Sequence, residues 1–251
     1  MKLARDTWLI FHRQMLLMAR TPVWIAIGLI QPIVYLLLFA PLLKMALGAQ
    51  TYAEAYQVYI PGLLTALVLF GGLFAGFTLL AELRSGVVER FRVTPVSRLA
   101  LLLGRALRET VVLLVQALLI TLMALPFGLT VGLGGVLLAY VLLAMMALAA
   151  SSVSYGITLL IRGDAALAPV INTVSQPLAL LSGTLLPIAL APHWLRSAAD
   201  GNPFYWAVQG LRAMFAGNLG APAVWQSLVV VAVLTAVTVG WSARLFSTRV
   251  Q

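Results

Sequence analysis

The sequence contains no cysteine, only two histidines and only seven acidic residues among 251. The missing cysteines exclude disulfide bonds and thiolate chemistry. His12 and His193 lie far apart along the chain, so no histidine cluster for a metal ion can be argued from them. The acidic residues all fall at or outside the ends of long apolar runs. Paired catalytic carboxylates and the intramembrane acids typical of ion-coupled carriers are therefore not expected.

Lysine is almost absent as well, because Lys2 and Lys44 are the only two. Neither follows a glycine-rich phosphate loop, so no ATP site of the chain's own is expected. No Ser/His/Asp set can be assembled in the apolar segments either, and we expect no enzymatic activity. The net charge of +9 is carried by cations that punctuate apolar runs, which argues against nucleic-acid binding.

Long apolar runs dominate the sequence, which is 62% hydrophobic with a mean hydropathy of +1.03. A membrane-spanning helix needs about 20 apolar residues. Four uncharged stretches fit one helix each, and a fifth, 110–161, is long enough for two around the turn signal PFGLTVGLGG. The sequence thus predicts an all-α polytopic membrane protein, a single transmembrane domain over residues 1–251. Its six helices are expected at about 21–43, 57–80, 106–127, 135–161, 167–188 and 223–244.

The cations indicate how these helices are oriented. With six spans, 13 of the 16 Lys and Arg residues lie on the side that holds both termini and the segment after span two. Cytoplasmic segments carry an excess of Lys and Arg. We therefore expect both termini, and the charged loop at 81–105, in the cytoplasm.

Two further segments are expected to lie at the membrane surfaces. In residues 1–20, Trp8, Phe11, Met15 and Met18 recur at helical spacing, which predicts an amphipathic helix on the cytoplasmic interface. A frayed tail is the alternative. Residues 189–222 are apolar and rich in aromatics, which predicts short helices re-entering the outer leaflet, with breaks at Pro192 and at residues 201–203. An ordinary apolar loop is the alternative there.

The cytoplasmic loop between spans two and three concentrates the charge of the chain. Glu82 and Glu89 are seven residues apart and share one face if the helix continues past the membrane. Thr94 precedes Pro95, which ends such a helix, and Ser97 can cap the next one. A helix, a sharp turn and a second helix would form an elbow able to pass motion between a soluble partner and the membrane. A loop that only enforces topology is the alternative.

Two segments of the sequence resemble those of a known protein family. ELRSGVVERFRVTPVSRLALLLGR is similar to the cytoplasmic loop of type-2 ABC exporter permeases, and LSGTLLPI followed by NPFYWAVQGLR is similar to their last outer segment. Within this family, the sequence looks like the daunorubicin-resistance permeases and the nodulation-factor exporters. The matching positions of the outer segment include Ser182, Gly183, Pro187, Asn202, Pro203 and Arg212.

The resemblance implies a half-transporter. Two copies would pair, expected to be a homodimer, above two separate ATPase subunits that hold ATP and Mg, while this chain binds no cofactor. Its coupling residues would be Glu82, Arg84, Gly86, Glu89, Arg90, Thr94, Pro95 and Arg98, with the N-terminal helix packed beside them. Membrane lipids would surround the dimer in a bacterial inner membrane.

The resemblance also places the substrate path between spans two and five of the two copies. Span two offers Phe70, Phe74 and Phe77, and span five offers Asn172, Gln176 and Leu180. Packing within the bundle is the alternative role for both groups.

The function expected is therefore that of a permease subunit which moves a lipid-like or amphipathic cargo outward by alternating access. Multidrug efflux and antibiotic resistance would follow from such an activity. A passive channel, an ion-coupled carrier and a membrane scaffold or assembly factor are the alternatives. The absence of intramembrane charge argues against the ion-coupled carrier.

Overall fold

The computed structural model of the chain describes residues 2–20, 23–46, 51–86, 97–161, 163–184 and 188–249. These residues form α-helices and two short 3-10 turns, with no strand among them. The long helices are α2 (Val23–Ala46), α3 (Tyr52–Arg84), α5 (Arg98–Ala124), α6 (Leu133–Ile161), α7 (Asp164–Ser182) and α10 (Pro222–Arg249). The shorter elements are α1 (Lys2–Ala19), η1 (Leu125–Phe127), η2 (Ile188–Leu190), α8 (His193–Asp200) and α9 (Pro203–Phe215).

Five of the described helices are long and apolar enough to cross a membrane, namely α3, α5, α6, α7 and α10. Because most of the structure consists of such helices, the expectation of an all-α polytopic membrane protein is confirmed. The first expected span corresponds to α2, whose stretch Gly28–Phe39 is apolar but shorter than a full span. The count of six spans therefore stays a prediction.

The ends of the helices follow local chemistry. The 110–161 run divides as expected, since α5 passes into η1 at Pro126 and the chain turns at Gly128, whose φ of 96° favours glycine. The fifth expected span is shorter than predicted, because α7 ends at Ser182 rather than at 188. Gly183 adopts a left-handed φ of 72° and closes the helix as a C-cap.

The core of the bundle is organised around α3, which packs against α2, α5, α6, α7 and α9. Its most extensive contact is with α6. A Cβ atom built on Gly76 would lie 2.3 Å from Thr158 Oγ1 and 2.5 Å from Ser154 Oγ. Small residues let two membrane helices approach closely, and the gain is van der Waals contact and interhelical hydrogen bonding. Here the amide of Gly76 donates to Ser154 Oγ at 2.8 Å.

The exposed side chains of α10 indicate which part of this helix contacts lipid. Trp225, Val229, Val233, Val237 and Trp241 are all exposed and recur every four residues. The two tryptophans are separated by roughly 24 Å along the helix axis at a rise of 1.5 Å per residue. Aromatic side chains at both ends of an apolar stripe are typical of the two membrane interfaces. This stripe is therefore expected to face the acyl chains.

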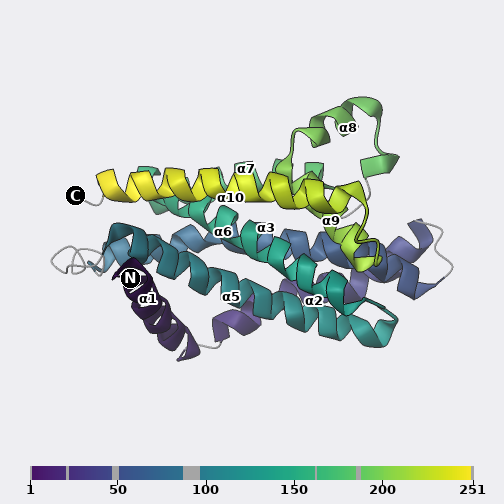
Figure 1. The fold of residues 1–251 in the computed structure, drawn as a ribbon, viewed down its shortest axis with the longest axis horizontal. Helices are drawn as coiled ribbons and strands as arrows, with labels where there is room; N and C mark the ends of the chain where they lie inside the picture. The colour runs from purple at the N-terminus through teal and green to yellow at the C-terminus, as the bar shows by residue number, and fades with distance from the viewer. Residues whose placement is uncertain are drawn as a thin grey trace.

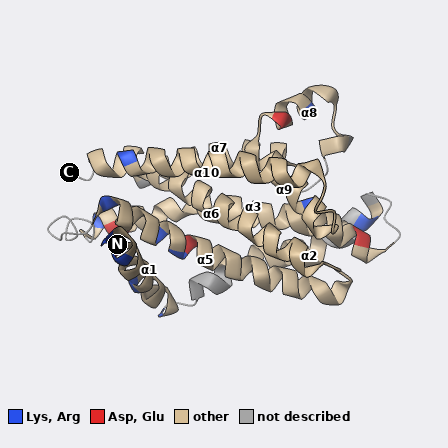
Figure 2. Cartoon of the chain, in the orientation of Figure 1, with Lys and Arg blue, Asp and Glu red and all other residues tan. Residues whose placement is uncertain are grey.

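The charged residues gather at the two ends of the bundle and leave its middle apolar (Figure 2). The N- and C-termini lie at the same end, which agrees with an even number of crossings (Figure 1). Helix α1 lies across the bundle at that end, while α8 protrudes at the other end (Figure 1). The cytoplasmic placement of the termini stays a prediction.

Candidate coupling site and transport path

The expected elbow begins where α3 ends. Helix α3 stops at Arg84, Ser85 caps it, and Gly86 follows in a left-handed conformation with φ 69°. The helix therefore does not continue to Glu89, and the expected common face of Glu82 and Glu89 on one helix is wrong. Glu89, Arg90, Thr94 and Pro95 lie outside the described residues, so their coupling roles stay predictions.

The second limb of the elbow starts as the sequence indicates. Ser97 is the N-cap of α5, and its Oγ accepts a hydrogen bond from the amide of Ala100 at 3.1 Å. Arg98 is exposed and donates through Nη1 to the carbonyl oxygen of Ser247 on α10. The start of α5 is thereby tied to the end of the last helix. Arg84 is exposed at the end of the first limb.

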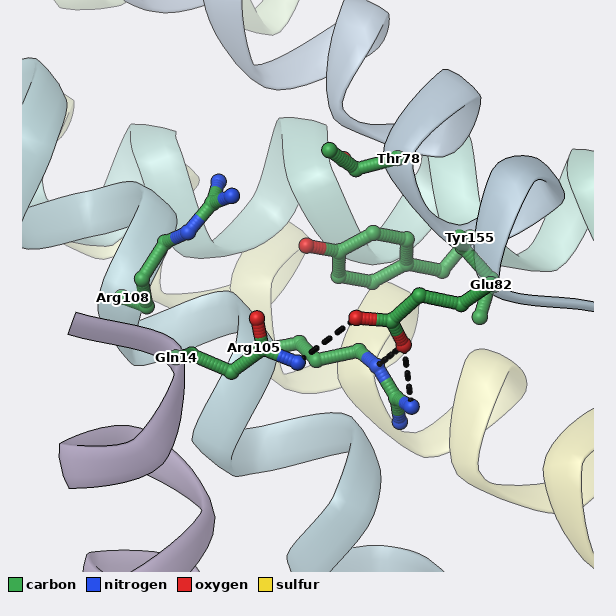
Figure 3. A pocket seen from close by; sticks show the side chains of 7 residues that line it. Gln14, Thr78, Glu82, Arg105, Arg108 and Tyr155 are labelled. Atoms are coloured by element: carbon green, nitrogen blue, oxygen red, sulfur yellow. Dashed lines mark hydrogen bonds and ion pairs between the residues drawn. The ribbon is translucent and has the colours of Figure 1, made fainter. Parts of the chain in front are cut away.

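Glu82 points into the bundle, where its carboxylate connects three helices. Its Oε2 accepts two hydrogen bonds from Arg105 of α5, from Nε at 2.8 Å and from Nη2 at 2.6 Å. Its Oε1 accepts a third from Gln14 Nε2 of α1 at 2.7 Å. We call Gln14, Glu82 and Arg105 the inner joint; Figure 3 shows these contacts as dashed lines. Both arginine donors share the single oxygen Oε2, and hydrogen bonds between oppositely charged groups are stronger than those between neutral groups.

The inner joint is largely shielded from solvent. The side chain of Arg105 is 5% exposed and that of Glu82 is 21% exposed. Arg105 also donates from Nη1 to the carbonyl oxygen of Leu101 at 3.2 Å. Because buried charges are costly unless paired and hydrogen-bonded, this arrangement fixes both side chains in one geometry.

A small polar cavity adjoins the inner joint. Thr78, Tyr155 and Arg108 line it together with the joint residues (Figure 3). The cavity has room for about one water molecule. Arg108 pairs with its neighbour Glu109, so the charges around the cavity are balanced.

Helix α1 is held against α5 by packing as well as by the inner joint. Thr7, Ile10 and Gln14 are its buried residues. A Cβ atom on Gly104 would lie 2.6 Å from Ile10 Cγ2, so only glycine permits this approach. The amphipathic helix itself is present, but its protein-facing side includes two polar residues that the apolar periodicity did not single out. Trp8, from the expected lipid-facing stripe, is 62% exposed.

The expected path residues divide between the core and the surface. Phe70 and Phe77 are partly buried against the core, whereas Phe74 is 41% exposed and stacks on Phe77 with ring centroids 5.6 Å apart. Asn172 and Gln176 are exposed on α7. Leu180 of the same helix is 66% exposed.

The outer motif closes the carboxyl end of α7. Asn202 accepts from the amide of Phe204 at 3.0 Å as the N-cap of α9, and its Nδ2 donates to the carbonyl oxygen of Leu178 at 2.8 Å. Pro203 takes the first position of α9, where its missing N–H leaves no helix bond unmade. The expected breaks at Pro192 and at residues 201–203 are confirmed as the starts of α8 and α9. Pro187 lies outside the described residues.

Arg212 completes this closure. Its Nη2 donates to the carbonyl oxygen of Gly183 at 2.8 Å, and its Nε donates to that of Val58 on α3 at 3.2 Å. Burial lowers the pKa of the Arg212 guanidinium to about 10. The side chain therefore remains cationic at neutral pH, next to the partial negative charge at the end of α7.

Sequence reasoning missed Gln14 and assigned no partner to Arg105. An ionisable residue near the membrane end of one span requires a partner, and Glu82 stands at the facing end of the neighbouring span. That signal could have paired Arg105 with Glu82. No comparable signal marks Gln14. In the described residues, no group of three or more His, Asp or Glu side chains could hold a metal ion.

Comparison with known proteins agrees with this architecture. The sequence profile of the ABC-2 type transporter family matches residues 5–216, and the chain belongs to this family. The family comprises membrane-spanning transport components of ABC transporters rather than enzymes, and they work with an ATPase partner.

Individual relatives have low sequence identity to this chain but align with most of its length. The chain is 25% identical over 239 residues to the daunorubicin resistance ABC transporter permease protein DrrB1 of Streptomyces coeruleorubidus, covering 94% of this chain and 84% of that protein. It is 24% identical over 219 residues to ycf38 of Cyanophora paradoxa, a protein named provisionally as a transport permease, covering 84% and 74%. The ycf38 protein of Porphyra purpurea is 24% identical over 203 residues, covering 79% and 70%.

Proposed function

We propose that this chain is the membrane-spanning permease subunit of an ATP-driven exporter. Two copies pair, and two ATPase subunits that bind ATP and Mg dock beneath the loop between α3 and α5. The assembly lies in a bacterial inner membrane with both termini of the chain in the cytoplasm. The cargo is lipid-like or amphipathic, such as a drug, a lipid or a glycolipid.

The observation that carries this proposal is the inner joint. Glu82 stands four residues before Gly86, where the chain leaves α3 for the loop. Any displacement of that loop by a partner acts first on the end of α3. Because Glu82 is bound to Arg105 and Gln14, the displacement reaches α5 and α1 together. The joint therefore suits the transfer of motion from an ATPase to two membrane helices.

The test is ATP-dependent transport by the assembled complex. The tagged chain is purified with its ATPase partner and reconstituted in proteoliposomes, and the fluorescent amphiphile daunorubicin serves as the probe, because a relative is named for resistance to it. ATP-dependent movement of the probe that vanadate abolishes supports the proposal. Equal movement with and without ATP contradicts it and favours a passive channel.

The coupling role of the loop is tested in the same complex. Glu89→Ala and Arg90→Ala are expected to leave the permease folded and the complex assembled, while ATP hydrolysis no longer responds to the probe. Arg196→Ala at the opposite end of the bundle is the matched control. Unchanged probe-stimulated hydrolysis in the two loop variants would rule out their coupling role.

A further inference from the structure

The lipid-facing stripe of α10 is followed by an arginine on the same side of the helix. Arg244 is exposed and comes three residues after Trp241, the last tryptophan of the stripe. At 100° per residue, Arg244 lies between Val233 and Val237 around the helix axis. At a rise of 1.5 Å per residue, it stands about 4.5 Å beyond Trp241 along that axis. The arginine therefore continues the acyl-facing side of α10 into the layer of the lipid head groups.

Trp241 has a fixed place at this membrane surface. A Cβ atom built on Gly156 of α6 would lie 2.1 Å from Cζ3 of the indole, so the missing side chain lets the ring rest against α6. The same tryptophan is 39% exposed, so part of it faces outward. A tryptophan that contacts protein on one side and lipid on the other is typical of the membrane interface. It indicates the depth at which Arg244 meets the bilayer.

A second cation reaches the same corner of the bundle from α5. Arg98, the first residue of that helix, is exposed and donates from Nη1 to the carbonyl oxygen of Ser247. This acceptor is three residues beyond Arg244, so the guanidinium of Arg98 lies at the last turns of α10. A guanidinium has five N–H donors, and the bond to Ser247 uses one of them. Arg98 thus keeps donors for a further acceptor.

The positive charge of this corner is not balanced by the protein. The sequence has no acidic residue after Asp200, so α10 contains none. On the neighbouring part of the bundle, Glu82 and Glu109 are paired with other arginines of α5. Within the described parts of the chain, neither Arg98 nor Arg244 has an ion-pair partner. The carbonyl end of α10 carries a partial negative charge, which the bond from Arg98 offsets.

The surroundings of the two arginines specify the kind of anion that fits. Guanidinium groups match the oxygens of a phosphate group in geometry as well as in charge. The stripe that leads up to Arg244 is apolar and offers a surface for acyl chains. Basic side chains of neighbouring helices at a membrane surface are typical binding sites for anionic head groups. An acidic protein surface fits less well, because Arg244 lies on the side of α10 that faces lipid.

We propose that Arg98, Arg244 and Trp241 form a binding site for an anionic phospholipid, one whose head group carries a net negative charge, such as phosphatidylglycerol. The phosphate group contacts both arginines, and the acyl chains lie along α10 beside the indole. The lipid thereby connects the first residue of α5 with the last turns of α10. This site goes beyond the proposed function, since it requires neither ATP nor cargo.

The test measures contact between lipid and Trp241 in the full-length chain. The chain is placed in nanodiscs of phosphatidylcholine that contain a small fraction of acyl-brominated lipid, either phosphatidylglycerol or phosphatidylcholine with the same chains. Bromine quenches tryptophan fluorescence on contact, and the part of the quenching that Trp241→Phe abolishes reports on the site. Brominated phosphatidylglycerol is expected to quench Trp241 more strongly than brominated phosphatidylcholine at the same fraction. Equal quenching of Trp241 by the two lipids overturns the proposal.

Variants of the two arginines test which side chains give the preference. Arg244→Gln is expected to lower the preference for phosphatidylglycerol about fivefold, and Arg98→Gln combined with Arg244→Gln about thirtyfold. Arg244→Lys keeps the cation and is expected to retain most of the preference. A preference that the double variant leaves unchanged contradicts the site.

Two matched controls distinguish a site from the general positive charge of the chain. Arg5→Gln removes an exposed cation from α1, at the same end of the bundle, and is expected to leave the preference at Trp241 unchanged. Trp225, at the opposite end of α10, is expected to show no preference between the two lipids. If Arg5→Gln lowers the preference as much as Arg244→Gln does, the overall field attracts the lipid and the proposal falls.

The competing partner for the two arginines is an acidic surface of the ATPase subunit. Loss of the ATPase from complexes of the double variant, with an unchanged lipid preference at Trp241, would assign the arginines to that partner and overturn the proposal. The lipid measurements use the chain without ATP. Their failure would therefore leave the proposed transport function standing, and failure of ATP-driven transport would leave the lipid site standing.

Discussion

The inner joint makes a sharp prediction about stability. Arg105→Met removes the cation and leaves the Glu82 carboxylate, whose side chain is 21% exposed, with Gln14 as its remaining partner in the joint. Removing one member of a buried ion pair costs about 3 kcal/mol, at the lower end of the usual range because Glu82 is not fully enclosed. For a chain of this length, that loss lowers the melting temperature by about 6–12 °C.

A double-mutant cycle separates the pair from its two members. Glu82→Leu combined with Arg105→Met removes both charges and is expected to cost less than either single change, because no uncompensated charge is left behind. The expected coupling energy is about 2 kcal/mol or more. Arg5→Met on the exposed side of α1 is the control and is expected to change the stability by less than about 0.5 kcal/mol.

Thermal unfolding in detergent, followed by tryptophan fluorescence, provides the assay, since the chain has six tryptophans. We expect strongly non-additive shifts in melting temperature for the variants of Glu82 and Arg105. If the shifts of the two single variants simply add in the double variant, the two side chains do not interact, and the inner joint as a unit would be refuted.

Three further changes test the packing and the closure of α7. Gly62→Ala is expected to destabilise the chain by about 1–3 kcal/mol, because the new Cβ would lie 2.0 Å from the Thr184 carbonyl oxygen. Gly132→Ala is the control, since its Cβ meets nothing within 4 Å. Equal melting temperatures of the two variants would contradict the close approach at Gly62. Arg212→Met removes two hydrogen bonds to backbone carbonyls and is expected to lower the stability by about 2 kcal/mol, with Arg196→Met as the exposed control. Gly104→Leu is expected to push Ile10 away and speed hydrogen exchange in α1 but not in α10, and unchanged exchange in α1 would show that the two helices are not held at this point.

The sequence predicts the helices far better than their contacts. Apolar runs longer than 20 residues leave little choice but helices in a membrane, and the prolines and glycines at 126–135 and 201–203 mark breaks that the structure has. The end of α7 was placed too late because the run stays apolar beyond Gly183, and hydropathy does not report a left-handed C-cap.

The residues of the candidate site could be predicted only in part from the sequence. Ser97 was found because a capping residue acts on its immediate neighbours, whereas Asn202 was found from the break at residues 201–203 and from the family resemblance of the outer segment. The partners of Glu82 could not be found from its spacing to Glu89, because they come from other helices at distant positions in the sequence, as the 68-residue separation from Gln14 illustrates. Tertiary pairing of this kind depends on how the helices pack, which periodicity along one helix does not determine.

In the proposed mechanism, an ATPase moves the inner joint and thereby drives the movement of cargo. The most direct measurement of this mechanism is ATP hydrolysis and daunorubicin movement in the same reconstituted complex, with the natural chain and with Glu82→Leu combined with Arg105→Met. We expect the double variant to remain folded, to hydrolyse ATP and to transport the probe at a small fraction of the natural rate. Full ATP-driven transport by the folded double variant would show that the inner joint does not couple the ATPase to transport.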